Sequence, residues 1–515
     1  MSKSVCAHMH GGGLKLVADT AGPDDAGAYS ATLFGTGRAL LADVPVGPGP
    51  GGLQADLENR EGAGGGGQVA GYSRLGPREQ DTRDGPLAAL ALAMVSSVRP
   101  AWPAAEPALP SAYVYFAQFL GHDLSRSNVS DPGAPLNLNT AALDLDTVFP
   151  PPTEHLQHMA GVYQQTGALV EQDVALGRTS RSSFDSFLDL PRDTGGRPLI
   201  PDTRSDANLF LAQLHVALLR YYVRLCRDGV PDPKQGLIDA VHQITLYDFL
   251  PRIIDAGTLA DIMANGRRLV APGTADPGHL LIPAEFAFAA YRFGHPMVRD
   301  RYTWSRTGPS PHFMPQLLAH TFNGTSLAMH DDGHRVLSFR WEADWHDSDA
   351  ATADNVAAPI TPVLYHEMGQ LDPGHLSEQP GPANLAQMTL ARGQSVGLTS
   401  AQGLWHADPG IFSGALLTPE QIAADQPSAI TAALTDGAAG DRLCDRTPLW
   451  FYTLREAQFL SGGARLGPLA GRIVAETLHA AICAARGGTV PAQGILTLPD
   501  LLRVSTTLDA GPPPP

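Results

Sequence analysis

The sequence is poor in the residues that define several familiar classes of protein. Only four of its 515 residues are cysteines, namely Cys6, Cys226, Cys444 and Cys483, and no two of them form a CxxC or CxxxC pair. This spacing argues against a disulfide scaffold and against a zinc site. Charged residues make up only 17% of the chain, and no stretch reaches the roughly 18 consecutive apolar residues that a membrane span requires. A globular chain without a membrane span is therefore predicted.

Basic residues are also in the minority. The chain has 35 lysines and arginines against 52 aspartates and glutamates, which gives a formal net charge of −17. Such an acidic surface repels the phosphates of nucleic acids and of anionic lipids. We therefore expect small molecules, and no nucleic acid, as partners. The first residues, MSKSVCAHMHGGG, lack the apolar core of a secretory signal, so a cytoplasmic location is expected.

Glycine and proline mark the ends of the chain. The first hundred residues are rich in Gly, Pro and Asp, with the run REGAGGGGQ at 60–68. We predict that 1–105 form an arm packed on the body of the protein. The chain ends in GPPPP, so 506–515 are predicted to be a disordered tail. Residues 106–505 are predicted to form one domain.

Helical patterns dominate that domain. Apolar residues recur every three or four positions at 113–126, 206–228, 236–250, 283–294, 447–461 and 468–486. Residues 299–360 are rich in Trp and Asp and show no such period. The predicted fold class is mainly α, with a single large helical domain, long loops and little strand.

The first motif with chemical potential contains a histidine. Residues 113–124 read YVYFAQFLGHDL. On a helix, Gln118 and His122 are four positions apart and share one face, whereas Asp123 is turned by about 100°. A histidine in an apolar helix is more often a satisfied core residue than a ligand. This motif alone therefore does not establish a site.

A second motif brings another histidine to the end of an apolar helix. Residues 287–296 read AFAAYRFGHP and include Arg292 and His295. On its own, the pattern fits a histidine that interacts with the helix C-terminus.

Two further motifs carry arginines. Residues 199–206 (LIPDTRSD) place Arg204 before a long helix, which one of the last two residues of the motif would cap. Residues 388–398 (MTLARGQSVGL) carry Arg392. The alternative readings are a surface arginine in a loop and an exposed basic turn. Taken together, the four motifs favour two histidines on either side of a flat, iron-centred ring, with arginines near its carboxylates or near a developing anion.

In this order, the motifs resemble those of the animal-type haem peroxidase (peroxidase–cyclooxygenase) superfamily. The resemblance spans roughly residues 110 to 480, and its later fragments are similar to the bacterial branch. It is carried by QFLGHDL at 118–124, DTRS at 202–205, LYDFLP at 246–251, YRFGH at 291–295, LARGQSVGL at 390–398 and TPLWFY at 447–452.

The resemblance implies a role for each matched position. His122 corresponds to the distal histidine, Gln118 to its pocket partner and Arg204 to the distal arginine, which would act together on peroxide. His295 corresponds to the proximal iron ligand. Arg292 and Arg392 match arginines near the haem propionates.

The sequence departs from the family at three positions. Gly121 and Ala207 stand where family members carry carboxylates that form esters with haem. Their absence predicts a non-covalent haem b. Thr389 stands where an asparagine accepts the N–H of the proximal histidine. A threonine hydroxyl accepts that bond more weakly, which would change the potential of the iron.

Calcium is left open by the resemblance. Asp123 matches a carboxylate that ligates calcium in the family, and the loop TSRSSFDS at 179–186 is rich in oxygen groups without the usual spacing. One carboxylate is far short of the six to eight oxygens that calcium takes. Asp123 would otherwise cap or pair locally.

The resemblance implies a haem peroxidase that reduces hydrogen peroxide and oxidises a small organic or halide donor through a ferryl intermediate, as in the response to oxidative stress. The alternatives are a biosynthetic tailoring oxygenase, a fatty-acid dioxygenase relative and a non-catalytic haem-binding protein. Dioxygenases of this family carry a radical-forming tyrosine three residues before the proximal histidine. That position is Arg292 here, and Tyr291 lies four before, which disfavours the dioxygenase.

Overall fold

The computed structural model describes residues 70–98, 109–128, 135–149, 190, 200–206, 208–271, 280–302, 312–313, 356–369 and 384–506. Ala207, the loop 179–186 and most of 299–360 lie outside these residues. The predicted boundaries of the arm, the domain and the tail therefore stay predictions.

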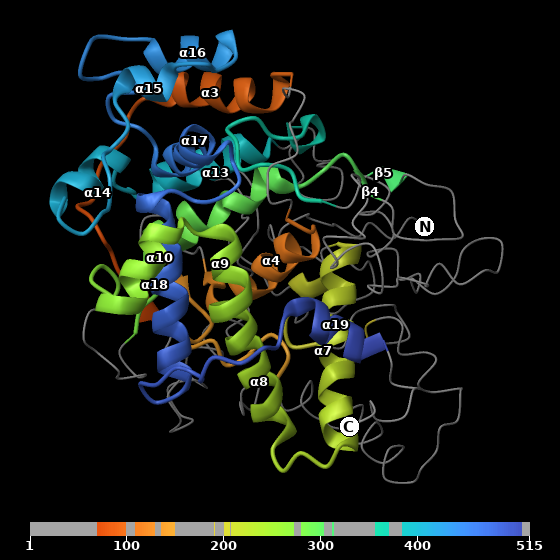
Figure 1. Cartoon of the computed structure of the whole chain (residues 1–515). Coiled ribbons are helices and arrows are strands. Elements are labelled where there is room, and N and C mark those ends of the chain that lie inside the picture. The colour runs from red at the N-terminus through yellow and green to blue at the C-terminus, as the bar shows by residue number, and fades with distance from the viewer. Residues whose placement is uncertain are drawn as a thin grey trace, which may run out of the picture.

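Helices account for most of the described chain, which confirms the predicted class (Figure 1). In chain order they are α3 (Asp84–Ser96), α4 (Ala112–Leu124), η1 (Thr203–Asp206), α7 (Leu209–Arg227), α8 (Pro233–Ile244), η2 (Thr245–Phe249), α9 (Leu250–Ile253), α10 (Ala256–Asn265), α11 (Ala284–Phe288), η4 (Ala290–Met297), η5 (His366–Gly369), α13 (Leu385–Ser395), α14 (Ala401–Ala407), α15 (Pro419–Ala423), α16 (Ser428–Thr435), α17 (Leu449–Ser461), α18 (Pro468–Ala485) and α19 (Leu498–Thr506).

The described strands are two residues long. β1 (Ala70–Gly71), β3 (Leu136–Asn137) and β2 (Ser127–Asn128) pair antiparallel in that spatial order. β4 (Arg301–Tyr302) pairs antiparallel with β5 (His312–Phe313).

Helix α4 lies near the centre of the helical body (Figure 1). Every one of its residues is buried, including the polar Gln118, His122 and Asp123. A helix that is buried on every side lies inside a core, with other elements packed around it. It contacts α7, η1 and η4, so the two histidine motifs are carried by neighbouring elements.

Three local expectations are corrected by the structure. α3 lies within the predicted arm, where no helix was expected, because its Leu- and Ala-rich sequence lacks a clear amphipathic period. Residues 388–398 are not an exposed basic turn, since α13 covers most of them and Arg392 is buried. The cap of α7 is Asn208, whose side chain accepts from the N–H of Leu211, because the short turn η1 occupies the residues before it.

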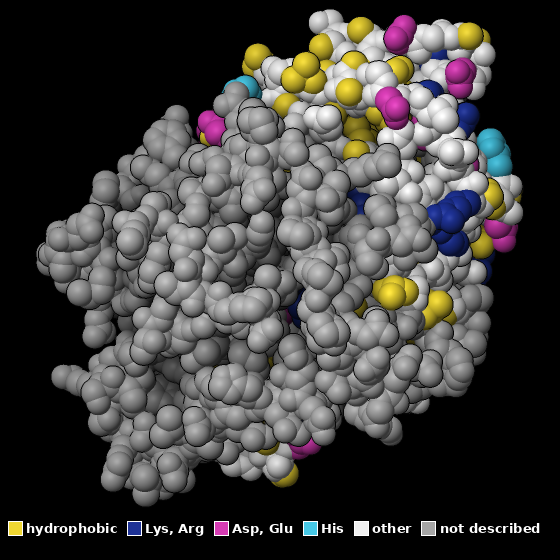
Figure 2. Space-filling view, turned by 180° about the vertical axis from the view of Figure 1, so that it is seen from behind, with side chains coloured by type: hydrophobic (Ala, Val, Ile, Leu, Met, Phe, Trp, Pro, Cys, Tyr) yellow, Lys and Arg dark blue, Asp and Glu magenta, His cyan; other side chains and the backbone are white. Residues whose placement is uncertain are grey.

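Hydrophobic side chains are exposed at the end of the molecule that α3, α15 and α16 form (Figure 2). Leu92 of α3, for example, is 62% exposed. None of the helices in the described ranges is both long and apolar enough to cross a bilayer.

Candidate functional site

The last turn of α4 holds His122 at the centre of the candidate site. His122 and Gln118 are both fully buried, and Oε1 of Gln118 accepts from Nδ2 of Asn208 at 3.2 Å. Nδ2 of Asn139 donates to the backbone carbonyls of His122, at 2.8 Å, and of Asp123, at 3.0 Å. These bonds satisfy carbonyls that the end of a helix would otherwise leave unpaired. The backbone that carries His122 is thereby fixed.

Arg204 lies beside His122, but its guanidinium is turned toward the protein. Its Nε and Nη2 donate to the carboxylate of Asp202 at 2.5–2.9 Å. Its Nη2 also donates to the carbonyl of His122 at 2.8 Å, and its Nη1 to that of Ser125 at 2.9 Å. Burial alone would raise the pKa of Asp202, but the charges of Arg204, Arg126 and His122 hold it well below its usual range. Asp202 is therefore an ionised partner of Arg204.

His295 lies in η4 and is held on two sides. Its Nδ1 is 3.5 Å from Oγ1 of Thr389 in α13, which itself donates to the carbonyl of Leu385 at 2.8 Å. The indole of Trp450 meets the imidazole edge-to-face with the centroids 5.5 Å apart, and its Nε1 donates to the carbonyl of Arg292 at 3.1 Å. Thr389 thus stands where the sequence placed it, at the limit of hydrogen-bonding distance.

Two buried arginines lie on the two elements that hold this histidine, Arg292 on η4 and Arg392 on α13. Nε of Arg292 donates to the carbonyl of Ala287 at 3.2 Å. Arg392 is 1% exposed, and within the described residues none of its three guanidinium nitrogens has a hydrogen-bond partner. Both guanidinium groups face the ring of Phe288, at 5.8 Å for Arg292 and 4.9 Å for Arg392. Burial lowers the pKa of Arg292 to about 9, helped by Arg392, and that of Arg392 to about 10.

This arrangement is suited to binding an anion. A buried cation without hydrogen bonds is costly unless a ligand of opposite charge completes it. The carboxylates of a small molecule or cofactor would supply that charge and accept the guanidinium N–H groups.

Sequence reasoning missed several residues that complete the site. The hydroxyl of Tyr72 lies 2.7 Å from Oγ of Ser125 and 2.7 Å from Oγ of Ser127, just after α4. The ring of Tyr72 contacts Phe288 with centroids 4.8 Å apart. Tyr72 follows a glycine-rich stretch without periodicity, so no sequence signal pointed to it. Asp202 did leave a signal, because it stands two residues before Arg204.

Asp123 serves the local fold. Its carboxylate accepts from the backbone N–H groups of Leu145 and Thr147, both at 3.0 Å, and from the hydroxyl of Thr147 at 2.9 Å. Burial, with the charges of Asp144 and Asp146, raises the pKa of Asp123 well above its usual range. In the part of the chain that the structure describes, no group of three or more His, Cys, Asp or Glu side chains is arranged to hold a metal ion. Calcium at Asp123 is therefore unsupported.

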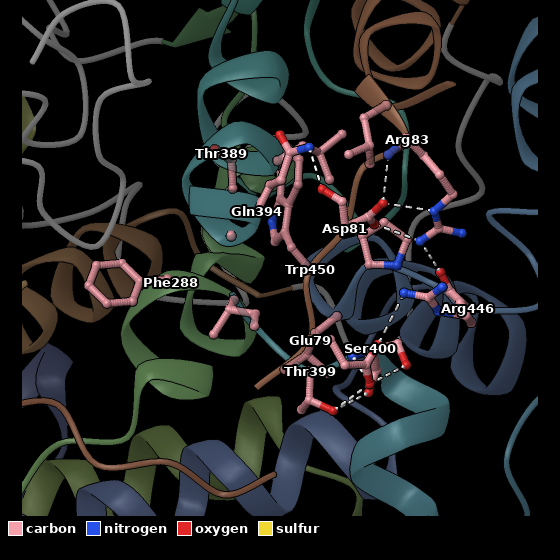
Figure 3. Close-up of a pocket in the computed structure, with 16 residues that line it drawn as sticks. Glu79, Asp81, Arg83, Phe288, Thr389, Gln394, Thr399, Ser400, Arg446 and Trp450 are labelled. Carbon is pink, nitrogen blue, oxygen red and sulfur yellow. Dashed lines mark hydrogen bonds and ion pairs between the residues drawn. The ribbon is translucent and has the colours of Figure 1, made fainter. Parts of the chain in front are cut away.

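A cavity of about 40 Å³ lies behind the residues that hold His295 (Figure 3). Phe288, Thr389 and Trp450 line it on the side of the histidine. Charged side chains at 79–83 and Arg446, which precedes α17, line the other side, and Asp81 forms an ion pair with Arg83 there at 2.6 Å. The volume is enough for a few water molecules.

Comparisons with known proteins agree on the fold. No family model matches the chain, and no curated protein matches it in sequence. Among solved structures, peroxidase A from Dictyostelium discoideum is similar, with a TM-score of 0.55 and 14% identity over 85% of this chain and 94% of that one. The fatty acid alpha-dioxygenase of Oryza sativa gives 0.53 and 12% over 86% and 80%. The Arabidopsis thaliana fatty acid alpha-dioxygenase gives 0.51 and 13% over 85% and 76%. At these identities the likeness concerns the fold.

Proposed function

We propose, from the premise that this chain has the fold of the animal-type peroxidase–cyclooxygenase superfamily, that it is a haem-dependent peroxidase. It would bind one haem b without a covalent link and use hydrogen peroxide to oxidise a small organic or halide donor. The observation that carries the proposal is the buried guanidinium of Arg392, which has no hydrogen-bond partner within the described chain and is carried by α13, the helix whose Thr389 contacts His295.

The residues present fit a haem. Its propionates would accept hydrogen bonds from Arg392 and Arg292 and balance their charge, because guanidinium groups bind carboxylates in a two-point geometry. The imidazole of His295 would ligate the iron. Gly121 lies inside α4 without a carboxylate to form an ester, which supports a non-covalent cofactor. When bound, the haem would supply the iron centre at which peroxide is reduced.

The distal residues would handle the protons of peroxide. His122 would take a proton from one oxygen of hydrogen peroxide and return it to the other, so that the departing oxygen leaves as water. Gln118 would line the same face of α4, one turn away. Arg204 would provide positive charge for the departing oxygen, and its bonds to the carbonyls of His122 and Ser125 support an added role in holding the last turn of α4.

Oxygenation of a fatty acid is the second candidate, and one feature favours it. Tyr291 is buried, its ring is stacked on Phe286 with centroids 4.5 Å apart, and its hydroxyl has no hydrogen-bond partner among the described residues. A buried phenol close to the iron ligand in sequence is suited to radical formation. Either reaction could serve a single biosynthetic step, in which the chain oxidises one dedicated substrate.

An absorption spectrum of the full chain with added hemin, before and after one equivalent of hydrogen peroxide, tests the proposal. We expect a Soret band that shifts on addition of peroxide and returns when a phenolic donor is added. A Soret band that ignores peroxide would leave a non-catalytic haem protein. Oxygen consumption with a fatty acid, in the absence of a donor, would instead support the second candidate.

A further inference from the structure

Residues 70–83, which we call the strap, link the two sides of the candidate site. At one end β1 pairs with β3, close to the end of α4. In the middle the backbone of Ser73 bonds to Ile282, at 3.0 Å, and to Ala284, at 2.9 Å, where α11 begins on the way to His295. The strap therefore contacts the segment that follows His122 and the segment that precedes His295.

The strap also contacts the segment that follows α13, the helix that carries Arg392. The guanidinium of Arg74 donates to the carbonyl of Gly397 at 2.8 Å and to that of Val396, directly after α13. The carboxylate of Glu79 accepts from the hydroxyls of Thr399, at 2.8 Å, and Ser400, at 2.9 Å. Figure 3 shows Glu79 directed toward Thr399 and Ser400, and all three residues line the cavity described above.

Tyr72 connects the strap to the buried arginines through Phe288. Its ring packs on Phe288, and Phe288 also faces Arg392 and Arg292. Its phenol is close enough to Arg392 and Arg204 for both charges to act on it, since they lower the pKa of Tyr72 against the stronger, opposite effect of burial. Its hydroxyl is held in place by Ser125 and Ser127. Tyr72 therefore bridges the end of α4 and the unpartnered guanidinium of Arg392.

We propose that the strap closes over the carboxylate edge of the bound haem, and that Tyr72 is the positioning residue that couples strap docking to haem binding. This inference rests on the proposed function. A carboxylate bound to Arg392 would fix the position of its guanidinium. The guanidinium packs on Phe288 and Phe288 packs on Tyr72, so both rings would be held in place as well. By thermodynamic linkage, anything that docks the strap then strengthens haem binding, and haem binding in turn stabilises the docked strap.

Hemin titration of the full chain is the first test. Tyr72→Phe keeps the ring on Phe288 and removes the hydroxyl that bonds to Ser125 and Ser127. We expect its dissociation constant for hemin to rise about tenfold, the effect of losing one or two buried hydrogen bonds. Tyr247→Phe is the matched control, because Tyr247 is also partly buried and also donates one tertiary hydrogen bond, to Pro491 at 2.7 Å. It should bind hemin within about twofold of the wild type.

Limited trypsin digestion gives a second measurement that does not depend on absorbance or activity. The strap contains three cleavage sites, after Arg74, Arg78 and Arg83. Hemin should slow cleavage there at least about tenfold in the wild type and clearly less in Tyr72→Phe. Cleavage after Arg503, on α19, serves as the internal reference and should not change.

The outcomes separate the inference from the proposed function. Failure of the wild type to bind hemin would overturn both. Normal hemin binding with equal affinity in Tyr72→Phe, or with strap cleavage that hemin does not slow, would overturn the coupling alone and leave the proposed function standing.

Discussion

The hydroxyl oxygen of Thr389 lies 3.5 Å from Nδ1 of His295. This distance is at the limit of a hydrogen bond, and the hydroxyl proton is already donated to Leu385. The imidazole of His295 is therefore only weakly anchored by Thr389. A histidine whose N–H is weakly bonded donates less electron density to a metal than one bonded to a strong acceptor.

Changing Thr389 should move the reduction potential of the haem-loaded protein. Thr389→Val removes the acceptor at nearly constant shape, so the ferric state loses stabilisation and the potential should rise. A tenfold change in the preference for one oxidation state corresponds to about 59 mV for one electron. Thr389→Asn, with a better acceptor, should lower the potential. A spectroelectrochemical titration in which both variants match the wild type would refute a role for this contact.

The two histidines should respond differently to substitution. His295→Ala should abolish hemin retention or shift the Soret band, because the iron loses its protein ligand. His122→Ala should retain hemin but react with peroxide about two to four orders of magnitude more slowly, since it loses the proton carrier. Stopped-flow mixing with peroxide measures the difference. Full reactivity in His122→Ala would remove His122 from the distal role.

We expect Arg392 to lower the stability of the haem-free protein and to strengthen haem binding. Its burial lowers its pKa to about 10, which reflects the cost of keeping an uncompensated charge in the core. Arg392→Met should therefore stabilise the haem-free protein, by on the order of 3 kcal/mol at about 1.4 kcal/mol per pKa unit. The same variant should bind hemin more weakly. Denaturant unfolding and hemin titration measure the two effects, and a loss of both stability and affinity would show that Arg392 is structural.

Glu456 should make stability depend on pH. Burial raises its pKa to about 7 from 4.5, although it accepts from the N–H groups of Leu469 and Ala470 at the start of α18. Because the folded state binds this proton more tightly, the stabilisation is fully present below pH 4.5 and is lost as pH rises through 7. Glu456→Gln, which does not titrate, should lack this component of about 3 kcal/mol. Urea unfolding of both proteins at pH 5 and pH 8 (values chosen on either side of the transition) would detect it, and parallel profiles would contradict it.

Tyr291 separates the two candidate reactions. Tyr291→Phe removes a hydroxyl without a hydrogen-bond partner in the described chain, so the fold should tolerate it. Peroxide-driven oxidation of a phenolic donor should then stay within about twofold of the wild type. Selective loss of oxygen uptake with a fatty acid would assign the chain to oxygenation instead.

The fold was largely predictable because its central helices carry strong periodicity. Residues 113–126 and 468–486 are long apolar patterns, and α4 and α18 match them to within two residues at each end. α3 was not predicted because its apolar residues surround the whole helix. Periodicity detects a helix only when one face is apolar and the other is polar.

The site was predictable only in part. The motifs identified Thr389, and the structure brings it to His295 as expected. They could not indicate that the guanidinium of Arg204 turns back onto Asp202, because side-chain direction depends on the burial of both groups. Tyr72 reaches the site only through contacts between distant parts of the chain, which local sequence does not encode.

The strap also sets the order in which the protein can be completed during synthesis. Arg74 and its partner Gly397 are 323 positions apart in the chain. At a translation rate of about 5–20 residues per second, the segment leaves the ribosome on the order of half a minute before its partner exists. The contacts of Arg74 and Glu79 therefore form only after α13 and the loop that follows it have been made, later than the pairing of β1 with β3. A cofactor enclosed by these contacts can be enclosed only once residues 396–400 have been made.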